Sequence, residues 1–148
     1  MTKTYLILVS ACLLLLGCST ACQSTPTPAS QNSVLVIYEH SGGIAGLRDQ
    51  LTIYSNGQCE LQRKDVEREF TLQPSELAHL KQLMEDPDFL ALEDNSLLRN
   101  TGADFFEYVV SYPAGEGKMH TVRAVTGAVP DALQPILAEL NRLISSSN

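Results

Sequence analysis

Short β-prone runs, separated by turn residues, occupy the chain from residue 33 to about residue 72. Val, Ile, Leu and Tyr dominate these runs, and Gly, Asn, Asp and Ser stand between them, as is typical of antiparallel strands. The pattern predicts strands at Val34–His40, Asp49–Tyr54 and Gln58–Lys64, with Val66–Leu72 as an optional short fourth strand.

The dipeptide Asn56-Gly57 stands between the second and third of these runs. Both central positions of a type I′ turn need positive φ, which Asn and Gly tolerate best. The sequence therefore predicts a tight two-residue hairpin at this point.

The hydrophobic period changes from that of a strand to that of a helix at Pro74. Pro74–Glu85 carries an apolar stripe, with Pro74 suited to the first helical position and Pro87 expected to end the helix. The stripe consists of Leu77, Leu80, Leu83 and Met84. A short apolar segment, Phe89–Leu92, is expected to pack under this helix, and a polar loop is expected at 93–101.

A second hairpin and a final helix complete the pattern. Asp104–Tyr112 and Met119–Val125 are predicted strands joined by 113–117, and an amphipathic helix is expected to begin at Pro135 after a turn. The order is β-β-β-(β)-α-β-β-α, with hairpins rather than crossover helices between strands. This order predicts the α+β class: an antiparallel β-sheet of five to six strands with two helices on one face.

The start of the chain has the features of a secretory signal. Lys3 precedes an apolar run, Tyr5–Leu16, that is shorter than the about 20 residues a membrane-spanning helix needs. The run ends in Leu15-Leu16-Gly17-Cys18, which resembles the lipobox of bacterial lipoproteins. The alternatives are an ordinary secretory signal cut nearby, an uncleaved anchor, or acylation at Cys22.

The lipobox resemblance implies that Cys18 is diacylated on sulfur, becomes the first residue of the mature protein and anchors it in a membrane. Two or more acyl chains give stable anchoring. Residues 1–17 are then a signal peptide, and 18–32 are the lipidated cysteine and a flexible Ser/Thr/Pro tether. Residues 33–144 are expected to form one domain, with 145–148 as a disordered tail. The location implied is the cell envelope, facing out of the cytoplasm, and Ser19 favours the outer membrane if there are two.

Charge and cysteine content narrow the range of partners. The formal net charge is −7, which argues against nucleic acid and against electrostatic binding to anionic lipid. A basic protein partner or simple solubility fits better. Cys22 and Cys59 could form a disulfide, although Cys59 as a small buried residue is the preferred interpretation. No Cys-x-x-Cys pair supports a zinc site.

The titratable residues give no pattern of a catalytic or metal centre. His40, His79 and His120 are far apart in sequence and are expected to be ordinary surface histidines. The acidic group Glu85, Asp86 and Asp88 surrounds Pro87 and is expected to be an acidic helix end. Nucleophile and metalloprotease motifs are absent from the sequence. We therefore expect no enzyme activity, no metal and no cofactor.

The segment Ser41-Gly42-Gly43-Ile44-Ala45-Gly46 has three glycines in six positions. It is not a phosphate-binding loop, because no Lys-Ser/Thr pair and no helix follow it. One interpretation is a strained connection between strands with Ile44 tucked into the core. The other is a loop that displays Ile44 and backbone groups to a partner.

Together with Tyr38, this segment resembles the Y-x-x-SGG-[FI]-AG signature of the emfourin-like family. These are small bacterial α+β proteins, typified by an inhibitor of a thermolysin-type metalloprotease. The layout of helices and hairpins from Val34 to Ile144 is also similar, with a longer Asp49–Lys64 hairpin. The chain also looks like bacterial lipoproteins that share the SGGIAG sequence.

The sequence thus predicts a lipid-anchored, non-catalytic binding module that contacts a protein partner through Ser41, Gly42, Gly43, Ile44, Ala45 and Gly46. The alternative, implied by the emfourin resemblance, is an inhibitor of thermolysin-type metalloproteases. A shared scaffold does not carry function by itself.

Overall fold

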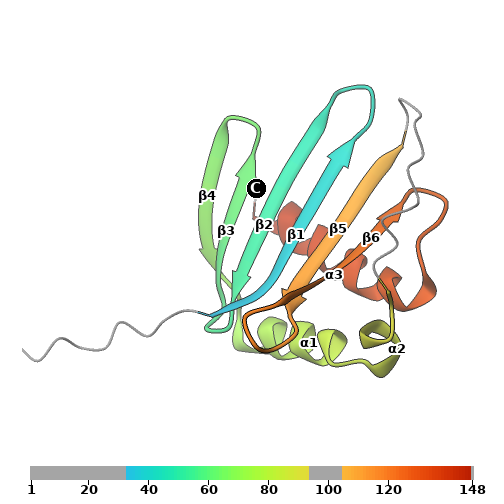
Figure 1. Ribbon diagram of the computed structural model, residues 1–148. Coiled ribbons are helices and arrows are strands. Elements are labelled where there is room, and N and C mark those ends of the chain that lie inside the picture. Colours follow the sequence, from blue (N-terminus) through green and yellow to red (C-terminus); the bar gives the residue numbers. More distant parts are fainter. Residues whose placement is uncertain (1–32, 94–104, 148) are drawn as a thin grey trace, which may run out of the picture. The chain divides into compact units, whose positions relative to one another are not determined.

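The computed structural model describes residues 33–93 and 105–147. The expected signal peptide, Cys18, Cys22, the tether and nearly all of the expected polar loop lie outside these ranges. Six strands form one antiparallel sheet in the order β4-β3-β2-β1-β5-β6 (Figure 1). The strands are β1 (Val34–Gly42), β2 (Leu47–Tyr54), β3 (Gln58–Arg63), β4 (Val66–Thr71), β5 (Phe106–Pro113) and β6 (Met119–Val125).

The helices follow the first four strands and the last one. They are α1 (Pro74–Met84), the short α2 (Pro87–Leu90), a 3₁₀ turn η1 (Asp131–Leu133) and α3 (Gln134–Ser146). In Figure 1, α1 lies across one end of the sheet and α3 crosses the strands. The α+β class and the antiparallel sheet are as the sequence predicts, and the optional fourth strand is present as β4.

Strand register brings buried side chains from all the inner strands together on one face of the sheet. Tyr38 of β1 is opposite Leu51 of β2 and Val110 of β5, and Leu51 is opposite Leu61 of β3. Side chains in these rows are at most 4% exposed. Directly opposed positions point to the same side of an antiparallel sheet, so one apolar face results.

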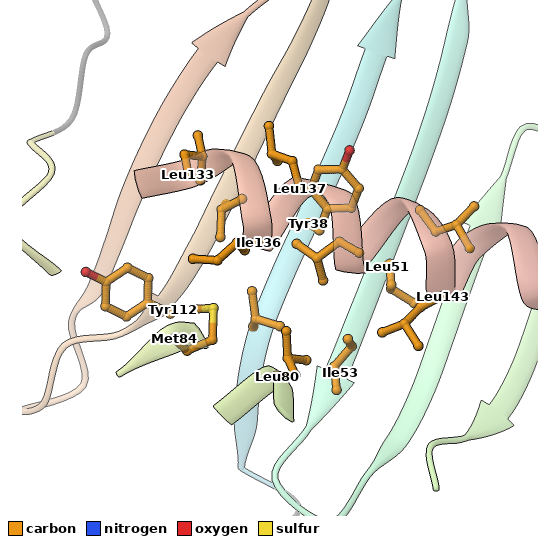
Figure 2. Close-up of a cluster of buried hydrophobic side chains, with 14 of the residues drawn as sticks. Tyr38, Leu51, Ile53, Leu80, Met84, Tyr112, Leu133, Ile136, Leu137 and Leu143 are labelled. Carbon is orange, nitrogen blue, oxygen red and sulfur yellow. The ribbon is translucent and has the colours of Figure 1, made fainter. Parts of the chain in front are cut away.

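The helices cover that face and complete a single core (Figure 2). Leu80 of α1 and Phe89 of α2 are fully buried. α3 contributes Ile136, Leu137, Leu140, Leu143 and Ile144. The core residues all lie between positions 36 and 144, and residues 32–148 form one compact unit. This stretch therefore has the core that a domain needs to fold alone.

The helix starts follow from local chemistry. Pro74 occupies the first turn of α1, and the backbone N–H of Gln73 donates to Glu76 Oε2 at 2.9 Å. Asp86 Oδ1 accepts from the N–H of Asp88 at 2.9 Å, which caps α2. The acidic group around Pro87 is thus partly a helix cap, and Pro87 begins a second helix three positions after Met84, where the first helix ends.

Besides shifts of one or two residues at the ends of other elements, such as β2 and β5, three local features differ from the sequence prediction. β1 extends through Ser41 and Gly42, because both residues pair with β2 on one side and β5 on the other.

At the first hairpin, Gly57 has φ of 90° but Asn56 is not among the residues with positive φ. The Gly57 N–H donates to the Tyr54 carbonyl at 2.9 Å, which indicates a three-residue loop ending in a left-handed glycine rather than a type I′ turn.

The third difference is at the end of α3, which continues to Ser146 instead of fraying after Ile144. The hydroxyl of Ser145 donates to the Asn141 carbonyl at 2.8 Å, and that of Ser146 to the Leu143 carbonyl at 3.1 Å. An Arg68 guanidinium N–H from β4 also donates to the Ser147 carbonyl. The backbone N–H of Ser147 also donates to the Leu143 carbonyl at 3.2 Å, so side-chain and backbone donors together hold the last turn of α3.

Candidate interaction site at the glycine-rich turn

The turn between β1 and β2 is a compact four-residue loop, Gly43–Gly46. The N–H of Gly46 donates to the Gly43 carbonyl at 3.0 Å, which closes a β-turn. The N–H of Gly43 donates to the Phe105 carbonyl at 3.1 Å. The turn is therefore tied both to itself and to the chain that enters β5.

Two of the glycines are required by the closeness of that chain. Gly42 has φ of 121°, and a Cβ there would lie 2.2 Å from the Phe105 carbonyl oxygen. Gly43 has φ of 72°, and a Cβ there would lie 2.8 Å from Cε1 of Phe106. Gly46 needs its glycine only for its φ of 62°, since no atom lies within 4 Å of the Cβ position.

Ile44 stands at the tip of this turn and is 88% exposed. The interpretation that tucks Ile44 into the core is therefore wrong: the strain is borne by the glycines, and the isoleucine faces solvent. Ala45 and Gly46 are exposed as well, whereas Ser41 and Gly42 are partly buried in β1. Phe105, whose carbonyl holds Gly43, is itself 40% exposed. Of the six expected site residues, two therefore belong to strand β1, and the other four form a turn with the exposed Ile44 at its tip.

Aromatic rings support the turn on the helix-covered face of the sheet. His40 stacks on Tyr108 with ring centroids 4.9 Å apart and contacts Phe106 at 5.2 Å. The Tyr38 ring is also stacked with His40, with its centroid 6.3 Å from that of His40. The Tyr38 hydroxyl donates to Asn141 Oδ1 of α3 at 3.0 Å. The rings connect the turn to the core, so the turn is not a loosely attached loop.

His40 is not the ordinary surface histidine that the sequence predicts. Its Nε2 is buried and has no hydrogen-bond partner within the part of the chain that the structure describes. Burial lowers the pKa of the His40 imidazole; the Asp49 carboxylate opposes this shift and the Arg63 guanidinium adds to it. His79 is exposed on α1, as the sequence predicts. His120 is partly buried, and its Nε2 lies 2.8 Å from the Leu92 carbonyl oxygen.

Asp49 and Arg63 form an ion pair beside His40. Nε and Nη2 of Arg63 donate to Oδ1 and Oδ2 of Asp49, each at 3.1 Å, and the Asp49 side chain is only 4% exposed. Sequence reasoning did not identify this pair. The alternation of side chains along β2 could have indicated the buried carboxylate, because Asp49 lies on the same face of the strand as Leu51 and Ile53.

Two further expectations concern metals and thiols. Among residues 33–93 and 105–147, no three His, Cys, Asp or Glu side chains are placed to hold a metal ion. Cys59 is a free, buried thiol, and burial raises its pKa to about 12. Cys59 belongs to the hydrophobic core, in agreement with the preferred interpretation of the sequence. Cys22, its hypothetical disulfide partner, lies outside the described ranges.

No family model matches the chain, and no curated protein matches it. Within the described ranges, none of the helices combines the length and apolar character needed to span a membrane.

Proposed function

We propose that this protein is a lipid-anchored, non-catalytic binding module of the cell envelope, which contacts a protein partner through Ser41–Gly46. The anchoring part of the proposal rests on the sequence Leu15-Leu16-Gly17-Cys18 and its resemblance to a lipobox. Acylation of Cys18 would hold the domain at a membrane surface, with the segment before residue 33 as the tether.

The observation that carries the binding part is the exposure of Ile44 on an ordered turn. A side chain that is 88% exposed contributes nothing to the core, yet the residues on either side of it are fixed by hydrogen bonds and close contacts. A turn held in one conformation loses little conformational entropy on binding. An apolar group at its tip gains free energy when a partner covers it.

The polar side chains near the turn support a binding role over a catalytic one. Asp49 is engaged by both donors of Arg63, and the Tyr38 hydroxyl is engaged by Asn141. A general base or nucleophile must reach a substrate, whereas these groups are occupied with one another. We therefore propose structural roles for them.

Inhibition of a thermolysin-type metalloprotease is the second candidate function, from the resemblance of Tyr38–Gly46 to the emfourin-like signature. One structural observation favours it: the turn is preformed and has the exposed apolar side chain of Ile44 at its tip. Protease–inhibitor complexes are typically pre-organised, with little backbone movement on binding. A rigid projecting turn suits insertion into an enzyme cleft.

The test uses residues 33–148, titrated against a panel of thermolysin-type proteases while peptide hydrolysis is followed. Stoichiometric inhibition that Ile44→Asp weakens at least tenfold, and that Val66→Asp does not, would support the inhibitor function. Val66 is the matched control because it is also an exposed apolar residue, 53% exposed, on the far edge strand β4.

If the panel gives no inhibition, the wider binding proposal is tested in intact cells. A photo-crosslinking residue placed at Ala45 should capture a defined protein partner, and the same residue placed at Glu67 of β4 should not. Identical crosslink patterns from both positions would contradict a binding surface at the turn.

A further inference from the structure

We propose that His40 is an acid-sensitive support of the Gly43–Gly46 turn: when its imidazole is protonated, the contact through which Phe106 holds Gly43 loosens. This inference concerns regulation of the proposed binding surface and rests on the proposed function for its biological meaning. Its physical part, the coupling of His40 to the turn, can be tested without any partner.

Phe106 is the mechanical link between the two. Its ring lies 5.2 Å from the His40 ring, centroid to centroid. The same ring occupies the space where a Gly43 side chain would stand, with Cε1 2.8 Å from the ideal Cβ position. A shift of His40 that displaces Phe106 therefore removes the packing under Gly43. The Gly43 N–H bond to the Phe105 carbonyl lies one residue away.

The neutral form of His40 suits this position and the protonated form does not. A neutral imidazole has one ring nitrogen without a proton, and leaving that acceptor unpaired costs less than burying an unpaired charged donor. Protonation makes both nitrogens donors. Nε2 would then be a buried donor with no acceptor in the described parts of the chain. Because His40 is partly buried, the new charge would also lose part of its hydration.

The charged and titratable groups around His40 do not supply the missing partner. They are Tyr38 on β1, Asp49 on β2, Arg63 on β3 and Tyr108 on β5. Asp49 attracts an imidazolium, but its oxygens, which accept from Arg63, make no hydrogen bond to Nε2 of His40. Arg63 repels an imidazolium, and the two tyrosines offer ring faces to His40. From α3, the uncharged Asn141 is bonded to Tyr38.

Opening of this end of the sheet restores water to the imidazole. Burial holds the pKa of His40 below its ordinary value of 6.5, so the opened state binds a proton more readily than the closed state. The equilibrium constant for opening must then rise as pH falls below 6.5, by up to about tenfold per pH unit until the closed-state pKa is reached.

The experiment measures hydrogen exchange by NMR on the full chain, ¹⁵N-labelled and held in detergent micelles, from about pH 7.5 to about pH 5. Exchange rates are corrected for the intrinsic pH dependence of amides. The protection of the Gly43 amide should fall several-fold across this range, while that of Val110, a fully buried residue in the middle of β5, falls less. Equal losses at both amides would mean that His40 responds only to global unfolding, and this would overturn the proposal.

Variants separate titration from packing. His40→Phe keeps an aromatic ring in the stack but has nothing to titrate, so the pH response of Gly43 should disappear. Phe106→Leu should leave the imidazole titration in place and uncouple it from Gly43. His79→Gln, an exposed site on α1, is the matched control and should change neither quantity. If His40→Phe does not fold, the Phe106→Leu variant and the comparison of the Gly43 and Val110 amides still test whether His40 is coupled to the turn.

A pH-independent Gly43 amide, or a response that persists in His40→Phe, would also overturn the proposal. None of these measurements involves a partner. Failure to find inhibition or crosslinking would therefore count against the proposed function alone, and a rigid turn at low pH would count against the regulation alone.

Discussion

Gly43 lies directly against the ring of Phe106, at a separation that leaves no room for a side chain. A Cβ at Gly43 would be 2.8 Å from Phe106 Cε1 and 2.9 Å from Cζ. The start of β5, some sixty positions further along the sequence, therefore determines which residue can stand at position 43. Both local backbone conformation and this distant contact fix the identity of the residue.

Gly43→Ala should therefore destabilise the domain more than Gly46→Ala. Both residues have similar positive φ, 72° and 62°, so the backbone strain of about 1–2 kcal/mol is common to both variants. Only the variant at Gly43 must also displace Phe106, which adds a further cost of about 1–2 kcal/mol. Urea denaturation of residues 33–148 measures both values, and equal midpoints would rule out the Phe106 contact.

The placement of Ile44 gives a second prediction, on stability rather than binding. Ile44→Ala should change the free energy of unfolding by no more than about 0.5 kcal/mol, because the side chain is 88% exposed. Ile136→Ala, the same chemical change at a fully buried site in α3, should cost about 2–5 kcal/mol. Thermal or urea unfolding of the two variants decides. A large loss for Ile44→Ala would mean that the tip of the turn is covered.

Most of the fold could be predicted from the sequence because its periods are clear. Alternating runs such as Asp49–Tyr54 match a half-buried strand, and the stripe in Pro74–Glu85 matches a helix. The turn type at the first hairpin was predicted wrongly, because the residues there permit more than one backbone conformation. Asn56-Gly57 is compatible with two loop geometries, and the one adopted has positive φ only at Gly57.

The candidate site could be predicted only in part, because it depends on strand register. The glycine segment was visible as a motif, but the fate of Ile44 was not, since exposure depends on what β5 brings beneath the turn. Gly42 pairs with Phe106 and His40 pairs with Tyr108 across β1 and β5. These partners are distant in sequence, so neither the aromatic support nor the unusual environment of His40 follows from local pattern.

The Asp49–Arg63 pair gives a third prediction. Arg63→Met should cost about 2–3 kcal/mol, because it leaves the buried Asp49 carboxylate without its two donors. This is below the about 3–5 kcal/mol for a fully buried pair, since the Arg63 side chain is 36% exposed and water can replace part of the bond.

Arg123→Met is the matched control for that variant. Arg123 pairs with Glu107 at 3.4 Å, with side chains 43% and 49% exposed, and exposed pairs contribute at most about 1 kcal/mol. Equal losses of stability for Arg63→Met and Arg123→Met, measured by urea unfolding, would show that the buried position of Asp49 has no energetic consequence.

The last prediction concerns acid pH and the start of α1. The Glu76 pKa lies below its ordinary value of 4.5, first because the Gln73 N–H donates to the carboxylate and second because Arg142 of α3 does so too. Between the folded-state pKa and about 4.5 the unfolded chain binds more protons than the folded chain. The contribution of Glu76 is therefore complete above about pH 4.5 and is lost as pH falls below it.

Glu76→Gln should accordingly lower stability at pH 7 by about 1 kcal/mol, which is typical of a lost helix-start interaction. The deficit should be smaller at pH 3 than at pH 7, because the contribution of the carboxylate falls as pH drops below about 4.5 towards the lowered pKa of Glu76. Glu67→Gln, at an exposed position of β4, removes the same charge away from any helix start. Glu67 has no arginine partner among residues 33–93 and 105–147, so this variant should lower stability at neither pH. The measurement is urea unfolding of residues 33–148 at the two pH values. A deficit for Glu76→Gln that is as large at pH 3 as at pH 7 would mean that the amide substitution disturbs packing, and that the charge of Glu76 does not tie α1 to α3.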